Sequence, residues 1–227
     1  MKNNPNRTLI LNTARKSFYM RGYKNTSIRM IASDLNMSNV NLFNYFKNKR
    51  EILRILFDDF LDSMYCPLNQ ITQYSEHPVE AMLVGIYVFQ YSLSYNKRLS
   101  ELYSEALEED IIVKIFVRNL YPFCKEITEL FSQQKISDNE LIYTLYSFYE
   151  TMMSINNRVA KKELSFAQDF LRDQHARLFY RLFYLNKHDF ETEEKKALAI
   201  SRKYNYGDIC NYWTTDWIDY DQPVNNS

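Results

Sequence analysis

Residues 26–50 contain two short helix signals separated by a turn of only a few residues. Ser38 precedes the second signal, where its hydroxyl can accept an unpaired amide hydrogen of the first helical turn. Met37 and Leu42 occupy the two positions of a hydrophobic staple around that cap. Asn36 lies in the turn, and asparagine tolerates the left-handed backbone conformation. The stretch therefore predicts two short helices joined by a tight turn.

The second of these helices is predicted over about residues 39–46. A further cap follows at Asn48, with Glu51 three residues later in a pattern like a capping box, and it opens a long helix. Leu42 and Phe46 are four residues apart, so they share one face of the short helix and are expected to point inward. Three asparagines remain on the outer face: Asn39, Asn41 and Asn44.

Residues that break helices are scarce, with three glycines and five prolines among 227 residues. An all-β protein needs many tight turns, so this composition argues against one. Pro67 is expected to end the long helix, Pro122 to kink a later one, and Ser137 to cap the next. The sequence predicts an all-α protein with helices over residues 7–21, 28–35, 39–46, from 48 to the proline at 67, 78–93, 99–107, 111–134, 138–159, 164–185 and 191–204.

Charge is unevenly distributed although the whole chain has a formal net charge of zero. Residues 1–55 contain eleven Lys and Arg against two Asp and Glu, a net charge of +9, and the remainder carries −9. A basic amino-terminal segment suits a polyanionic partner, and an acidic remainder would repel one. The pattern favours a single docking surface on the first 55 residues.

An ordered series of residues carries a family signature: Gly22-Tyr23, Thr26-Ser27-Ile28, Ile31-Ala32, Met37-Ser38, Leu42-Phe43, Tyr45-Phe46, Lys49 and Ile52. Over about residues 8–55 this series resembles the DNA-binding half of TetR-family transcriptional regulators. The resemblance implies an amino-terminal helix-turn-helix domain in residues 1–50, and a larger helical ligand-binding and dimerisation domain in residues 51–227. It further implies a repressor that a small-molecule effector releases from a palindromic operator in double-stranded DNA.

The resemblance also assigns DNA contacts by position. Asn39, Asn41 and Asn44 are expected at base edges in the major groove, and asparagine pairs best with adenine, so an A·T-rich palindrome is expected. Val40 and Asn41 replace a glycine and a threonine that are common in the family. Ser27, Ser38, Tyr45 and Lys49 are expected at phosphates of the DNA backbone, and Arg29 is a further expected DNA contact.

The rest of the chain is rich in aromatic residues, and the family implies an effector pocket among them. Each aromatic side chain taken alone fits core packing better, but buried tyrosines need partners for their hydroxyls, which suits a pocket with polar fixtures. Aromatic or amphipathic effectors are preferred on this ground. The candidates are Tyr87, Phe89, Tyr91, Tyr103, Phe116, Tyr121, Tyr146 and Tyr149.

The family pattern makes the helices at about 138–159 and 164–185 a homodimer interface. Part of the tail from Tyr206 on is expected to dock on the body, because it contains Trp213 and Trp217, while the role of residues 187–227 as a whole stays open. Three scattered cysteines and three scattered histidines match no disulfide, metal or catalytic spacing, so no cofactor, metal or enzymatic role is expected. No apolar run is long enough for a membrane span, and a cytoplasmic location is expected. Two alternatives stay open: a structural or nucleoid-type DNA binder without a ligand, and an enzyme in the helical body.

Overall fold

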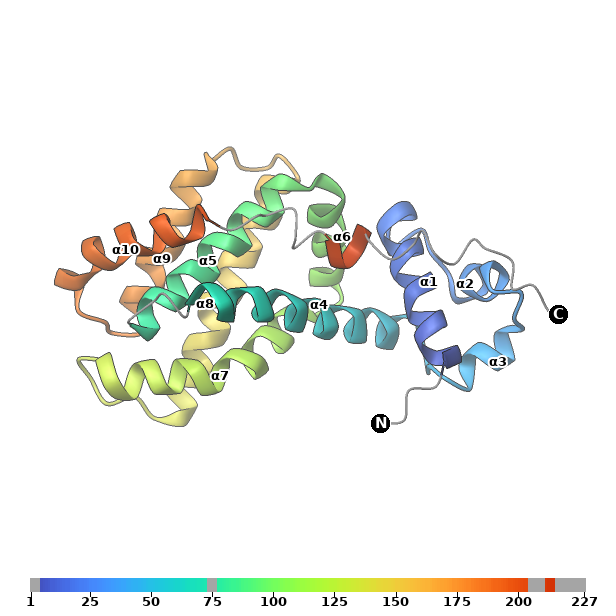
Figure 1. Cartoon of the computed structure of the whole chain (residues 1–227), viewed down its shortest axis with the longest axis horizontal. Helices are drawn as coiled ribbons and strands as arrows, with labels where there is room; N and C mark the ends of the chain where they lie inside the picture. The colour runs from blue at the N-terminus through green and yellow to red at the C-terminus, as the bar shows by residue number, and fades with distance from the viewer. Residues whose placement is uncertain (1–4, 73–76, 204–210, 215–227) are drawn as a thin grey trace.

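The computed structural model describes residues 5–72, 77–203 and 211–214, and within them the backbone forms ten α-helices and no strand. A small group of helices, α1 to α3, forms a head at one end of the molecule (Figure 1). The long helix α4 leaves this head and runs along the larger body formed by α5 to α10. The predicted all-α architecture is confirmed.

The head begins with α1, Pro5–Arg21, followed by α2, Ile28–Asp34, and α3, Asn39–Phe43. Gly22 ends α1 in the left-handed region, with φ of +88°, and its amide donates to the carbonyl of Phe18 at 3.0 Å. Helices commonly end this way because glycine has no Cβ to clash there.

The third helix is shorter than predicted, since Asn44 is its C-cap. The chain nevertheless continues in a tight turn in which the amide of Phe46 donates to the carbonyl of Leu42 at 3.2 Å. The Phe46 side chain is therefore still buried, 1% exposed, beside the fully buried Leu42. The predicted inward face is confirmed although the regular helix ends early.

Helix α4, Lys49–Thr72, starts where the Asn48 side chain accepts a hydrogen bond from the Glu51 amide at 2.8 Å. The Glu51 carboxylate turns back to the amide of Lys47, at 2.7 Å, so the capping pattern is present with its return bond shifted by one residue. The expectation that Pro67 ends this helix is wrong, because helical backbone continues to Thr72. A proline inside a helix removes one hydrogen-bond donor, which lowers the stability of the helix but does not have to end it.

The body consists of α5, Pro78–Tyr95, α6, Lys97–Glu108, α7, Ile112–Phe131, α8, Asp138–Ala160, α9, Gln168–Leu182, and α10, Lys187–Ser201. Helix α5 is buried on most of its surface because it packs against α9 and α10 as well as α4 and α6. Helices α7 and α8 pack against each other on another side. Helix α6 lies at the end of the body nearest the head and contacts α1 (Figure 1).

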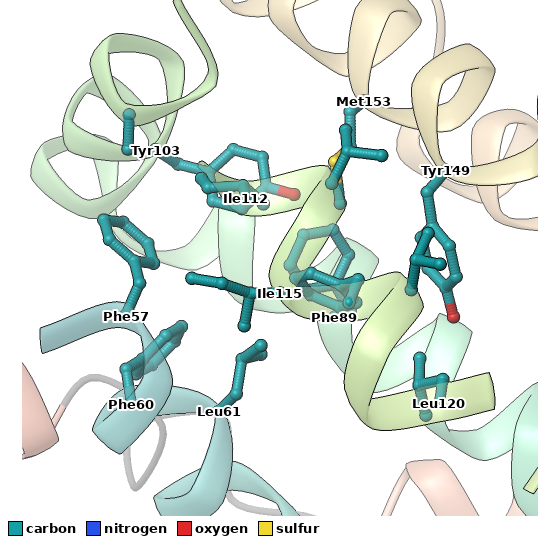
Figure 2. Packing of buried hydrophobic residues seen from close by; sticks show 14 of the residues in the cluster. Phe57, Phe60, Leu61, Phe89, Tyr103, Ile112, Ile115, Leu120, Tyr149 and Met153 are labelled. Carbon is teal, nitrogen blue, oxygen red and sulfur yellow. The ribbon is translucent and has the colours of Figure 1, made fainter. Parts of the chain in front are cut away.

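Aromatic side chains fill much of the body core. Phe57 of α4, Tyr103 of α6 and Phe89 of α5 belong to one buried cluster (Figure 2). The ring centre of Tyr103 lies 6.3 Å from that of Phe57 and 5.2 Å from that of Phe89. Pro122 lies inside α7, and a full capping box at Ser137 opens α8, as predicted. None of the helices in the part of the chain that the structure describes is long and apolar enough to cross a membrane.

The last helices are displaced from their predicted positions. Helix α9 starts at Gln168 rather than at 164, because the preceding residues form a turn in which Lys162 has φ of +62°. Helix α10 starts at 187 rather than at 191. Polar turn residues and helix-terminal residues have similar compositions, so local sequence did not separate them.

Candidate nucleic-acid interface

One serine cap fixes the start of each of the two helices in the helix-turn-helix. The hydroxyl of Ser27 accepts from the Met30 amide and that of Ser38 from the Asn41 amide, each at 3.2 Å. Asn36 has φ of +52° in the turn between the helices, as expected for the residue that reverses the chain. These caps fix the residues at which α2 and α3 begin.

Helix α3 has one buried face and one exposed face. Leu42 is fully buried in the head core. Asn41 and Asn44 are exposed and Asn39 is half-buried, so all three asparagines lie outside the core. The arrangement leaves a row of carboxamides accessible, and carboxamides carry both a donor and an acceptor for base edges.

Two apolar side chains share that exposed face and were not among the predicted site residues. Val40 is 71% exposed and Phe43 is 51% exposed. Their positions in the helical repeat, beside the outward asparagines, are the signal that could have identified them. Apolar side chains on a groove-reading helix contact the methyl group of thymine.

The residues expected at phosphates differ in their surroundings. Ser27, Arg29 and Ser38 are exposed. The hydroxyl of Tyr45 accepts a hydrogen bond from the Asn6 side chain at 3.3 Å, and its ring is half-buried. Ser27 and Arg29 lie at the start of α2, and Ser38 and Tyr45 lie on either side of α3 in the chain.

Lys49 occupies a different setting from the other predicted phosphate ligands. Its ammonium donates to the carbonyl of Tyr23 at 2.8 Å and to that of Thr26 at 2.9 Å. The same ammonium lies 4.0 Å from the centre of the Tyr23 ring. Burial lowers the pKa of this lysine, partly offset by the nearby Glu109 and Glu105 carboxylates. The geometry gives Lys49 a structural contact inside the head.

Acidic residues at the end of α6 hold the loop between α1 and α2. The Glu105 carboxylate accepts from the Tyr23 amide at 2.6 Å and from the Lys24 amide at 3.4 Å. The carbonyl oxygen of Glu109 accepts from the guanidinium of Arg50 at 2.7 Å. Burial and the neighbouring Glu109 carboxylate raise the pKa of Tyr23 to about 12. The head is thus attached to the body by charge-assisted hydrogen bonds.

Four of the eight aromatic pocket candidates stack on one another in the core. Phe89 lies 5.2 Å from Tyr103 and 5.3 Å from Phe116, and Phe116 lies 5.1 Å from Tyr149, measured between ring centres. Figure 2 shows Phe89, Tyr103 and Tyr149 within the layer of buried side chains. These contacts make the four rings part of a packed core.

Of the other four candidates, Tyr87 and Tyr91 both lie beside the Arg172 guanidinium. Tyr87 is fully buried with its ring under the Arg172 guanidinium, 5.6 Å away, and burial raises its pKa. Tyr91 donates from its hydroxyl to Asp169 at 2.6 Å. Tyr121 and Tyr146 are half-buried. Among the eight, only Tyr103 lines the cavity between α5, α6, α8 and α9, and none lines the cavity between α1, α6 and α8.

The described cysteine and histidine residues form neither a reactive thiol site nor a metal-binding group. Cys124 is buried, and burial raises the pKa of its thiol to about 12, which leaves it unreactive. The side chains of Cys66 and Cys210 lie outside the described residues, as does Trp217. The described residues contain no group of three or more His, Cys, Asp or Glu side chains placed to hold a metal ion.

The sequence is similar to known bacterial transcriptional regulators. The model of the bacterial regulatory proteins of the tetR family matches residues 10–56. The uncharacterized HTH-type transcriptional regulator YuxN of Bacillus subtilis (strain 168) is 26% identical over 122 residues, which are 53% of this chain. The aligned part spans only 38% of that relative.

Two solved structures share the fold. The crystal structure of RolR without ligand superposes with a TM-score of 0.60 at 12% identity, covering 83% of this chain and 96% of that one. The fatty acid degradation regulator FadR from Bacillus halodurans gives a TM-score of 0.52 at 17% identity, covering 78% of this chain and 96% of that one. At these identities the likeness establishes the fold alone. The family match over the head, together with the helix-turn-helix geometry, identifies residues 10–56 as a DNA-binding domain of the tetR family of bacterial regulatory proteins.

Proposed function

We propose that this chain is a sequence-specific repressor that binds palindromic double-stranded DNA as a homodimer and is released by a small molecule bound in its body. The observation that carries the proposal is the face of α3, where carboxamide side chains are exposed while Leu42 anchors the opposite face. A helix of this kind docks in the major groove, where each base pair presents a distinct pattern of donors and acceptors.

The composition of this face favours A·T base pairs. Asn41 and Asn44 can each pair with the N6 and N7 atoms of adenine, and Val40 can pack on a thymine methyl group. Around this face, Ser27, Arg29 and Ser38 supply hydroxyl and guanidinium donors for phosphate oxygens. The net charge of +9 on residues 1–55 supplies the sequence-independent attraction.

The dimer is proposed through α8 and α9, which pack against each other in the body. Each leaves large apolar side chains exposed, among them Tyr143 at 75% on α8 and Phe170 at 48% on α9. Exposed apolar surface of this kind marks interaction sites. A second copy of the chain is the proposed occupant, because a two-fold axis would present two α3 helices to successive major grooves.

Selection of bound sequences from a random duplex pool tests the proposal. The expected result is enrichment of an A·T-rich inverted repeat whose half-sites are about one helical turn, roughly 34 Å, apart or a multiple of it. Retention of all sequences alike would favour the alternative of a structural, nucleoid-type binder without an effector. No retention of duplex DNA at moderate salt would refute DNA binding altogether.

A cavity distinguishes an effector-regulated repressor from a nucleoid-type binder, because only the regulated protein needs space for a ligand. Two cavities of about 300 Å³ each are formed by described residues, one between head and body and one within the body. This volume reaches the lower end of the range for small-molecule sites, roughly 300 Å³ to 1,000 Å³. Their presence supports regulation by an effector.

A further inference from the structure

The cavity within the body lies between α5, α6, α8 and the start of α9. Its inner end is formed by the buried side chains of Gln90, Tyr103 and Asn156, and its mouth by the exposed Lys97 and Glu101. A volume of about 300 Å³ equals that of about ten liquid water molecules. The cavity therefore holds a small molecule about the size of a sugar.

Carboxamides from three helices line this cavity and are already oriented. The Asn156 side-chain amide donates to Gln90 Oε1 at 3.0 Å, and Gln90 Nε2 donates to Gln168 Oε1 at 2.7 Å. This relay leaves Asn156 Oδ1 and Gln168 Nε2 without hydrogen-bond partners among the described residues. One acceptor and one donor are thus held in place at the cavity wall.

A fourth carboxamide, that of Asn157, joins the wall from α8. Its Oδ1 accepts from the hydroxyl of Ser104 on α6, and its Nδ2 has no partner in the described part of the chain. Ser94 and Ser100 add hydroxyls nearer the mouth. The lining therefore offers donors and acceptors that have no partner in the described part of the chain, and an apolar ligand would strip water from them without replacing its hydrogen bonds.

The charge of the cavity is balanced. Lys97 and Glu101 are the charged side chains of its lining, and they form an ion pair of 3.7 Å one helical turn apart. No ionised group stands at the inner end. A charged ligand would lose hydration there without gaining a counter-ion.

From this lining we infer that the cavity is a binding site for a small uncharged molecule bearing several hydroxyl or carboxamide groups, such as a monosaccharide or a nucleoside. This ligand class differs from the aromatic or amphipathic effectors that the aromatic composition suggests. The inference deepens the proposed function and rests on it where release of DNA is concerned.

Helix α6 connects this site to the head through adjacent residues. Ser104 bonds Asn157 at the cavity wall, and the next residue, Glu105, accepts the Tyr23 amide of the head. A ligand that takes the Asn157 carboxamide breaks the Ser104 contact. The α6 segment that holds the head is then free to shift relative to α8.

The test is ligand-observed saturation-transfer NMR on the full chain without DNA. The probes are uridine and glucose as uncharged polar molecules, benzoate as a charged aromatic one, and hexanoate as a charged aliphatic one. The informative variant is Gln168→Met, which removes a carboxamide at the cavity and keeps the side-chain length. Gln174→Met is its matched control, because Gln174 is an exposed glutamine of the same helix that does not line the cavity.

Uridine or glucose is expected to bind, with affinity reduced about tenfold in Gln168→Met and unchanged in Gln174→Met. Absence of binding by both uncharged probes overturns the assignment, as does binding that Gln168→Met leaves intact. Preferential binding of benzoate or hexanoate in a Gln168-dependent manner overturns the ligand class.

A second experiment tests the connection through α6: the affinity for the selected duplex DNA is measured with and without a saturating concentration of the probe that binds. Weaker DNA binding in the presence of the probe, abolished by Glu105→Gln, supports it, and unchanged DNA affinity at saturation overturns it. Because probe binding is measured without DNA, failure of the DNA-binding proposal leaves the cavity result intact.

Discussion

The ammonium of Lys49 lies 4.0 Å from the centre of the Tyr23 ring and donates a hydrogen bond of 2.8 Å to the carbonyl oxygen of the same residue. A second bond goes to the carbonyl of Thr26. The first residue of α4 is thereby attached to the loop between α1 and α2. The opposite side of that loop is held by the α6 carboxylate of Glu105. The loop is therefore held from both the connecting helix and the body.

Replacement of Lys49 by methionine is expected to destabilise the protein by about 2 kcal/mol, since it removes two charge-assisted hydrogen bonds and a cation–π contact. The free energy of unfolding in urea measures the loss. Lys47→Met is the control, because Lys47 is exposed and its ammonium has no partner among the described residues. Equal losses in the two variants would contradict the structural role of Lys49.

Asn41→Ala is expected to relax sequence preference at one base step of each half-site by about 1–3 kcal/mol, because one bidentate pairing with adenine disappears. Competition between the selected duplex and single-base variants measures the change. Arg29→Ala is the comparison: if its guanidinium binds phosphate as proposed, its removal should weaken binding to all duplexes together and lower the slope of log affinity against log salt by about one. Uniform weakening in Asn41→Ala would exclude it as a base reader.

The head was predictable because its signals are local. The serine caps, Asn36 in the turn and the Leu42–Phe46 pair all act within a few residues of the chain. The contacts that position the head are different in kind. The bond from Lys49 to Tyr23 joins residues 26 positions apart, and that from Tyr23 to Glu105 joins residues 82 positions apart. No local pattern in the sequence encodes such pairings.

The pocket was not predictable for a related reason. An aromatic side chain at helical spacing looks the same in sequence whether it fills a core or lines a cavity, and Phe89, Phe116 and Tyr149 proved to stack on each other. The carboxamides that line the cavity are spread over α5, α8 and α9. Only packing of the helices brings Gln90, Asn156 and Gln168 together.

His175 is expected to make stability depend on pH below neutrality. It is buried in α9, neither ring nitrogen has a hydrogen-bond partner in the described part of the chain, and burial lowers its pKa to about 4. The unfolded chain takes up this proton below about pH 6.5 while the folded chain stays neutral, so folding loses stability as pH falls from about 6.5 to 4. The loss between pH 7 and pH 5 is about 2 kcal/mol.

Urea unfolding of the wild type and of His175→Leu at both pH values isolates this contribution, since other titrating groups affect both proteins alike. The difference between pH 7 and pH 5 is expected to shrink by about 2 kcal/mol in the variant. An unchanged difference would show that His175 is protonated in the folded protein.

Trp213 is expected to be the main anchor of the carboxy-terminal tail. Its indole is fully buried and lies 5.3 Å from Phe57 and 5.7 Å from Phe60 of α4. The neighbouring Tyr212 ring lies 4.9 Å from the Arg15 guanidinium of α1, so this short segment spans the joint between head and body. That placement agrees with the predicted docking of the tail.

Trp213→Ala is therefore expected to lower the free energy of unfolding by about 3 kcal/mol. Trp213→Phe should lose less than half as much, because it keeps the aromatic packing and removes an indole N–H that has no partner among the described residues. Tyr95→Ala is the control, because Tyr95 is exposed, and it should change the free energy of unfolding in urea by less than about 0.5 kcal/mol. A Trp213→Ala loss as small as that of the Tyr95 variant would mean that the tail is not anchored there.

The proposed dimer makes its own prediction at α9. If Phe170 is buried against a second copy, Phe170→Glu places a carboxylate in an apolar interface, and the dimer dissociation constant should rise at least about a hundredfold. Sedimentation equilibrium at micromolar concentration measures this. Tyr95→Glu is the matched control, since Tyr95 is an exposed aromatic residue at the end of α5, on neither proposed interface helix. Because two heads must bind together, Phe170→Glu should also weaken binding to the inverted repeat far more than binding to a single half-site. A wild-type chain that sediments as a monomer, or a variant that stays dimeric, would remove α9 from the interface.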